Sequence, residues 1–271
     1  MLDMINPTVK NILFILLCLI ALHTSAQTTD TAKKTKADTI KQDITSVPDT
    51  VKHLHSKTWT WIPPVALVGY GFSSFVIKPV RNVDYYFRAR IARSDPNYNS
   101  KIADYLQIAP AVMVYGLNLA GVEGKNKFVD RTALLILSGG ILTGADGLKF
   151  IMHRQRPYGN DKLSFPSGHT GAAFLTAEFL AQEYSGKSVW YGVVGYTFAA
   201  ATGVLRMYGR DHWFSDCVAG AGFGILSTKA AYFVYPYIRN ALTHKGKHGR
   251  SSMIMPGYYN GTPGLSFAMQ L

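Results

Sequence analysis

The chain has few cysteines and few acidic residues. Its 271 residues include two cysteines, and 16 Asp and Glu stand against 28 Lys and Arg. Cys18 lies in an apolar run near the N-terminus, so removal of that run would leave Cys217 as the only thiol. A lone thiol excludes an intramolecular disulfide. The formal net charge of +12 favours an anionic partner, which would be a nucleic acid, a membrane surface or a phosphorylated substrate.

Long uninterrupted apolar runs are also scarce in the body of the chain. Stretches such as 65–77 fall short of the ~20 residues that cross a bilayer. Other apolar segments contain carboxylates, including Asp146 and Glu178, which are tolerated only when they face a cavity or a partner. The sequence contains no nucleic-acid-binding motif and no internal repeat. An anionic phosphate substrate, at or near an anionic membrane, is therefore the favoured partner.

The first 26 residues are typical of an export signal. Lys10 precedes an apolar core at 12–22, and residues 24–26 are the small residues of a cleavage site. The alternative is an uncleaved membrane anchor. Residues 27–57 are polar and rich in Thr, Lys and Asp, which predicts a disordered linker. We expect an exported, periplasmic protein that is associated with the membrane or integral to the inner membrane.

Residues 58–240 have the apolar pattern of a helical domain. Six helices are predicted, at 62–78, 102–122, 131–151, 168–183, 188–205 and 212–232. The basic and aromatic segment 78–100 is either an amphipathic helix over the mouth of a site or a structural connector. In the tail, 241–271, Asn260-Gly261 precedes an alternating apolar run, which predicts a small β-hairpin.

Three short motifs in the second half of the chain contain the residues of a phosphate site. Together they supply three cations, two histidines, one carboxylate and a glycine at a helix start. The residues are Lys149 and Arg156-Pro157, then Pro166-Ser167-Gly168-His169, then Arg206, His212 and Asp216. Arginine grips phosphate oxygens in pairs, and phosphoryl transfer depends mostly on positioning and charge stabilisation. Such a set can hold a phosphoryl group and attack it with a nitrogen nucleophile, and it needs no metal or other cofactor.

The spacing within the first and third motifs predicts their geometry. His212 and Asp216 are four residues apart, so on a helix they would share one face. The carboxylate would then fix the imidazole tautomer and leave the other ring nitrogen free to attack phosphorus. Lys149 and Arg156 are seven residues apart, which corresponds to two turns of a helix that Pro157 would end.

The second motif predicts a loop that enters a helix. Backbone N–H groups at such a helix start point at an anion, and Gly168 lets the backbone approach closely. His169 lies one step into the helix, where it can give a proton to the leaving oxygen. The second motif therefore predicts both an anion cradle and a general acid.

In content and order the three motifs resemble the signature of the type 2 phosphatidic acid phosphatase family, which includes bacterial acid phosphatases and vanadium haloperoxidases. The resemblance covers roughly 102–235. It implies an all-α bundle with the site at helix ends, with His212 as nucleophile, Asp216 as its orienting carboxylate and His169 as general acid. The implied phosphate ligands are Lys149, Arg156, Ser167, Gly168 and Arg206. One departure is Leu205, where the family usually has a serine whose hydroxyl lies near the phosphate.

Other polar residues lie near the motifs. His153, Arg154 and Arg210 either widen the positive field or are solvated charges, and the second interpretation is favoured. Asp211 is a further carboxylate beside His212 and could compete for the orientation of that ring. Each of the carboxylates within apolar segments is expected to face the site or a neighbouring donor.

The resemblance implies a metal-independent phosphatase that hydrolyses phosphomonoesters or diphosphates through a phosphohistidine. The envelope lipids phosphatidate, undecaprenyl diphosphate and lipid A are the substrates considered. A soluble, non-specific periplasmic acid phosphatase is the alternative, and a vanadium-dependent haloperoxidase or a non-catalytic phosphate binder stay open. The expected partners are a phosphorylated substrate and a membrane surface, and no nucleic acid.

The number of membrane spans decides which side the site would face. If residue 27 lies outside the membrane, six spans would place the site on the cytoplasmic side. An exported phosphatase is expected to face outward, which favours a periplasmic domain over six full spans.

Overall fold

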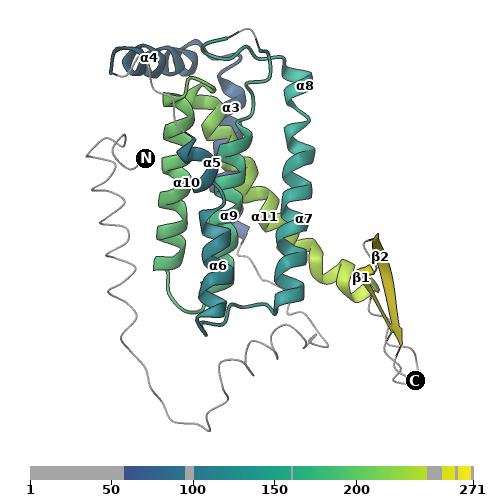
Figure 1. Cartoon of the computed structure of the whole chain (residues 1–271). Coiled ribbons are helices and arrows are strands. Elements are labelled where there is room, and N and C mark those ends of the chain that lie inside the picture. Colours follow the sequence, from purple (N-terminus) through teal and green to yellow (C-terminus); the bar gives the residue numbers. More distant parts are fainter. Residues whose placement is uncertain (1–57, 95–100, 160, 243–251, 260–261, 270–271) are drawn as a thin grey trace.

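The computed structural model describes residues 58–94, 101–159, 161–242, 252–259 and 262–269. These residues form a bundle of α-helices and a two-stranded hairpin (Figure 1). The predicted all-α fold with a small C-terminal hairpin is therefore confirmed. The predicted export signal and polar linker lie outside the described residues.

The helices follow one another with short connections. In chain order they are η1 (Thr58–Trp61), α3 (Ile62–Ser73), α4 (Lys78–Ser94), α5 (Ile102–Leu106), α6 (Ala109–Leu119), α7 (Phe128–Asp146), α8 (Lys149–Met152), α9 (Gly168–Tyr184), α10 (Trp190–Tyr208) and α11 (Phe214–Leu242). Helix α9 lies at the centre and packs along both α10 and α11. Helix α11 also packs against α3 and α7. Helices α8 and α10 end, and α9 and α11 begin, at the end of the bundle next to α4 (Figure 1).

Glycine sets the distance between the two central helices. A Cβ atom at Gly224 in α11 would lie 2.2 Å from the carbonyl oxygen of Gly171 in α9. No real Cβ contact is that short, so α9 and α11 approach as closely as backbones allow only because glycine has no side chain. The frequent Gly and Ala of the sequence thus correspond to tight packing between helices.

The predicted helix 62–78 ends early, at Ser73. The hydroxyls of Ser73 and Ser74 each donate to a carbonyl oxygen three residues earlier, both at 2.7 Å, and such bonds compete with helix continuation. A new helix, α4, begins at 78 with Pro79 in its first turn, where the missing N–H costs nothing. It turns 87° from α3 and lies across one end of the bundle (Figure 1). The helical interpretation of the basic, aromatic segment is confirmed for 78–94.

Two other predicted helices are each divided in two. The segment 102–122 forms α5 and α6, because Pro110 in the first turn of α6 has no N–H to continue the preceding helix. The segment 131–151 lies in α7 and α8, with the break at Gly147. Helix α8 then ends at His153, whose φ of 46° places it in the left-handed region.

Arg156 therefore does not lie on the helix of Lys149. The predicted two-turn helix that ends at Pro157 is wrong, because the left-handed residue at 153 ends α8 first. Arg156 lies in a non-helical connection, where its N–H donates to the carbonyl oxygen of Asp161 at 3.1 Å. The connection brings Arg156 back over the bundle end by a loop and not by a helix.

The C-terminal tail forms the predicted hairpin. Strands β1 (Ser252–Tyr259) and β2 (Thr262–Met269) pair in antiparallel register, with Ser252 opposite Met269. The predicted turn residues, Asn260 and Gly261, lie outside the described residues. The alternating apolar pattern of this tail is therefore confirmed as strand.

Among the residues that the structure describes, two helical stretches are long and apolar enough to cross a membrane. They are Phe128–Met152, which combines α7 and α8, and Phe214–Asn240 in α11; the bent pair of α3 and α4 would make a third. On the first stretch, the side chains of Ile136, Phe150 and Ile151 are 70%, 68% and 71% exposed. The described part of the chain thus has fewer candidate spans than its six predicted helices. Its apolar outer face fits association with a membrane.

Candidate active site

The predicted site residues lie on, or between, helices whose ends meet at the bundle end that α4 covers (Figure 1). Two connections form this region, one from α8 to α9 and one from α10 to α11. The start of α9 and the last turn of α10 complete it. The sequence prediction that helix ends converge here is confirmed, although the connections supply more of the site than expected.

His212 lies in the second connection, two residues before α11 begins. Its ring is buried, and Nδ1 donates to the carbonyl oxygen of Ser164 at 2.7 Å. Because a carbonyl oxygen only accepts, Nδ1 carries the proton and Nε2 is left with its lone pair. The predicted helical pairing with Asp216 is wrong, since His212 precedes the helix and the nearer Asp216 oxygen is 3.9 Å from Nδ1.

Asp216 forms hydrogen bonds with both connections at the site, including the one that contains His212. Its carboxylate accepts hydrogen bonds from the Ser164 hydroxyl, from the Trp213 N–H at 2.9 Å and from Arg154 Nη1 at 2.6 Å. Ser164 therefore donates to Asp216 with its side chain and accepts from His212 with its backbone. Asp216 orients the imidazole through Ser164.

A second carboxylate, on α4, extends this network. Asp84 is 1% exposed and accepts from Arg154 Nη2 at 2.6 Å, and from the N–H and hydroxyl of Ser215 at 2.8 and 2.7 Å. Arg154 thus bridges the carboxylates of Asp84 and Asp216 with its two terminal nitrogens. The favoured interpretation of Arg154 as a solvated charge is wrong, because its side chain is only 12% exposed.

The three predicted cations surround His212. Burial lowers the pKa of His212 well below its ordinary value, and the charge of Arg156 lowers it further. Arg206 and Lys149 act in the same direction. The hydrogen bond to the Ser164 carbonyl opposes these effects but does not outweigh them. At neutral pH the imidazole is uncharged, which is the form that attacks phosphorus.

The cations currently contact protein carboxylates and a carbonyl group. Lys149 donates to the Asp146 carboxylate and to the carbonyl oxygen of Pro166, the latter at 2.7 Å. Arg156 Nη1 and Arg206 Nη2 approach the two oxygens of Asp211 at 3.1 and 3.0 Å. Asp211 therefore joins two arginines and does not compete with Asp216 for the imidazole. Among the described residues, the buried Nε of Arg206 has no hydrogen-bond partner, as expected for a donor that awaits an anion.

The second motif forms the predicted helix start. Helix α9 begins at Gly168, and the Ser167 hydroxyl caps it by accepting from the Thr170 N–H at 3.5 Å. A Cβ at Gly168 would lie 3.2 Å from the Asp146 carboxylate and 3.5 Å from Lys149 Nζ. The start of α9 therefore lies directly against the first cation.

His169 occupies the first turn of α9 and is 36% exposed. Its Nε2 lies 3.0 Å from an oxygen of Asp104, a residue of α5. Burial and the charge of Arg206 lower the pKa of His169, whereas Asp104 and Asp211 raise it. The ring is thus at the edge of the cation cluster, with one nitrogen on a carboxylate.

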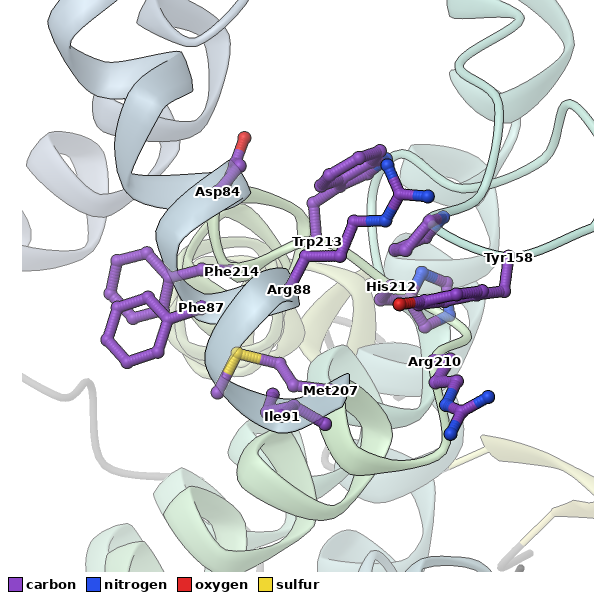
Figure 2. A pocket seen from close by; sticks show the side chains of 11 residues that line it. Asp84, Phe87, Arg88, Ile91, Tyr158, Met207, Arg210, His212, Trp213 and Phe214 are labelled. Atoms are coloured by element: carbon purple, nitrogen blue, oxygen red, sulfur yellow. The ribbon is translucent and has the colours of Figure 1, made fainter. Parts of the chain in front are cut away.

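Helix α4 closes one side of a pocket next to His212, as Figure 2 shows. Arg88 from this helix lies over the ring of Tyr158 at 4.8 Å and over that of Trp213 at 5.6 Å. Arg210 approaches the Tyr158 ring at 4.8 Å as well. The basic, aromatic helix therefore lies beside the site, as one of its two interpretations predicted.

The other carboxylates within apolar segments are also accounted for. Glu178 accepts from Gln182 at 2.6 Å and lies 3.1 Å from Lys229, while Asp146 pairs with the site lysine. Both face neighbouring donors, as predicted. Leu205, directly before Arg206, brings no hydroxyl to the cluster.

Part of the chain matches a known protein family. Residues 131–240 match the model of the PAP2 superfamily. The chain carries a PAP2 superfamily domain. The family resemblance inferred from the three motifs is confirmed, and all eight predicted site residues lie within the matched PAP2 range. Asp84 and Asp104 lie before it.

Proteins similar to this chain include a lipid A 1-phosphatase from Porphyromonas gingivalis, 33% identical over 158 residues. The match covers 56% of this chain and 35% of the relative, so the chain spans about a third of that protein's length. Among solved structures, Aquifex aeolicus LpxE matches with 18% identity and a TM-score of 0.39, over 53% of this chain and 92% of its own. A Bacillus subtilis transmembrane PAP2 type phosphatidylglycerolphosphate phosphatase matches with 16% identity and a TM-score of 0.45. This match covers 66% of this chain and 98% of the Bacillus protein.

Proposed function

We propose that this PAP2 protein is a phosphatase that removes phosphate from envelope lipids, with His212 as the nucleophile. The observation that carries the proposal is the state of the His212 ring. It is buried and uncharged, Nδ1 is held by the Ser164 carbonyl at 2.7 Å, and three cations surround it. A neutral nitrogen within a positive cluster combines a nucleophile with stabilisation of the charge that develops on phosphate oxygens.

The proposed reaction has two displacements at phosphorus. In the first, His212 Nε2 forms a bond to phosphorus while the ester oxygen leaves with a proton from His169. In the second, water attacks the phosphohistidine, His169 takes a proton from that water, and the bond between nitrogen and phosphorus breaks. Lys149, Arg156 and Arg206 hold the phosphate oxygens in both steps, with the N-terminal turn of α9 as a further anion site.

Lipid A is the first substrate that we propose, because the Porphyromonas gingivalis relative acts on its 1-phosphate. Phosphatidate and undecaprenyl diphosphate present the same phosphate chemistry at a membrane surface and are the comparators. The exposed apolar face of α7 and α8 supports a lipid substrate over a soluble one, since it would keep the enzyme at the bilayer. We place the site on the periplasmic side, in agreement with the predicted export signal.

The test is phosphate release by the purified full chain in mixed micelles. Lipid A, phosphatidate, undecaprenyl diphosphate and para-nitrophenyl phosphate would be compared with and without a chelator and orthovanadate. We expect lipid hydrolysis that survives the chelator and is blocked by vanadate, which mimics the five-coordinate transition state. His212→Gln should abolish turnover.

His153→Asn is the matched control for that variant. His153 is an exposed histidine of the same region, and asparagine tolerates its left-handed backbone. It should keep wild-type activity. Wild-type protein that releases no phosphate from any of the four esters would contradict the proposed function.

A further inference from the structure

We infer that Asp104 is the positioning residue of the general acid: it holds the His169 imidazole from α5 and stabilises the protonated form of the ring during the reaction. The inference deepens the proposed function and rests on it. Asp104 lies outside the 131–240 range of the PAP2 match and belongs to none of the three motifs. The sequence motifs therefore do not identify it as a site residue.

The geometry places Asp104 between the acid and a cation. One carboxylate oxygen is 3.0 Å from His169 Nε2 and 3.9 Å from Arg206 Nη1. Helix α5 packs against both α9 and α10, so the positions of His169 and Arg206 are fixed relative to it. The five-residue helix α5 thus places the carboxylate of Asp104 at the edge of the cation cluster.

The charges around His169 show why a carboxylate is needed there. Burial and Arg206, on α10, lower its pKa, and Asp211, in the connection to α11, raises it. Lys149 and Asp146 lie beside the neighbouring Gly168 as an ion pair of opposite charges. Of the two carboxylates that raise the pKa of His169, Asp104 has the larger effect and is the one in direct contact with the ring.

The role of Asp104 in the reaction is electrostatic and positional. In the first displacement, the ester oxygen leaves phosphorus and takes a proton from the His169 imidazolium, which becomes neutral. In the second displacement the ring regains a proton from the attacking water. Asp104 exchanges no proton in either displacement and only stabilises the charged ring, as the carboxylate does in other carboxylate–histidine pairs.

Asp104→Asn tests this role with little risk to the fold, because the side chain is 44% exposed. The variant should lower the pKa of His169, so the protonated fraction at neutral pH falls. In the pH profile of kcat/KM for phosphatidate, we expect the alkaline limb to shift to lower pH by roughly 0.5 to 1 pH unit. At pH 7 kcat should fall by about three- to tenfold with little change in KM. Asp104→Glu should recover part of the loss.

Two comparisons separate an acid–base role from a structural one. The loss should be smaller with para-nitrophenyl phosphate, because its leaving group needs less protonation than an alkoxide. Glu123→Gln removes an equal charge from an exposed position in the connection between α6 and α7 and should leave the profile unchanged. An equal loss at every pH and with both substrates would overturn the inference.

An NMR titration keeps the inference independent of turnover. The imidazole signal of His169 in labelled full chain, assigned by its loss in His169→Gln, should titrate at lower pH in Asp104→Asn than in wild type. Equal titration midpoints would overturn the role of Asp104 whether or not the protein is active. A clear shift in a protein that hydrolyses no ester would contradict the proposed function alone.

Discussion

The carboxylate of Asp211 occupies the place where two arginines would hold a phosphate. It lies 3.1 Å from Arg156 Nη1 and 3.0 Å from Arg206 Nη2, and its side chain is 28% exposed. An incoming phosphate needs the same N–H donors and meets a like charge there. Asp211 therefore holds the arginines in position while the site is free of substrate and opposes the anion that replaces it.

Asp211→Asn should tighten the binding of phosphate analogues. We expect orthovanadate to inhibit the variant at a concentration about fivefold lower, which corresponds to about 1 kcal/mol. Vanadate inhibition curves for phosphate release by the full chain would measure this. Asp161→Asn is the control. Asp161 is more exposed than Asp211 and contacts Arg156 but not Arg206, so its substitution should change vanadate inhibition less. Weaker inhibition of Asp211→Asn would show that the carboxylate mainly preorganises the arginines.

The residue types of the site could be predicted from the sequence, but several of their partners could not. The three motifs supply His212, Asp216 and the cations, and the structure brings them together. The contacts of Arg154 could not be foreseen, because its partners Asp216 and Asp84 are 62 and 70 positions away in the chain. Nothing in the local sequence distinguishes such a buried bridging arginine from a solvated one.

At the scale of helices, the breaks decide where the site residues lie. The turn after Ser73 sends α4 across the bundle end, where Asp84 reaches the network of Asp216. The left-handed residue at 153 lets the chain return with Arg156 in a loop. Apolar periodicity predicted the helices themselves, since it records burial along each face. It could not predict breaks made by hydroxyl groups and a positive φ.

Helix α7 provides a prediction on the membrane. Its outer face is apolar, and we expect the side chain at Ile136 to lie in the bilayer. In a Cys18→Ser, Cys217→Ser background, Ile136→Cys in isolated membranes should resist a water-soluble maleimide and react after detergent is added. Glu123→Cys, in the exposed connection before α7, should react under both conditions. Equal labelling of Ile136→Cys without detergent would place this face in water.

For the molecule as a whole, the fold brings motifs spread from 149 to 216 together into one cation cluster around His212. The motifs and their family resemblance predicted that cluster and the all-α class, and the alternating apolar tail predicted the hairpin. A helix at 78–100 over the site was one of two interpretations of that segment, but Asp84 and Asp104 were not predicted as contributors to the site. Asp84 on α4 and Asp104 on α5 each contact a site residue or its direct partner. The site therefore depends on tertiary contacts between the two halves of the helical domain.

The most direct test of the account is to trap the phosphorylated enzyme. Full chain would be mixed with phosphatidate, quenched within milliseconds to seconds at alkaline pH, where phosphohistidine survives, and digested for mass spectrometry. We predict phosphate on His212 in the wild type, more of it in His169→Gln when an aryl phosphate is the donor, and none in His212→Gln. Phosphate on any other residue, or turnover by His212→Gln, would contradict the assignment of His212 as the nucleophile.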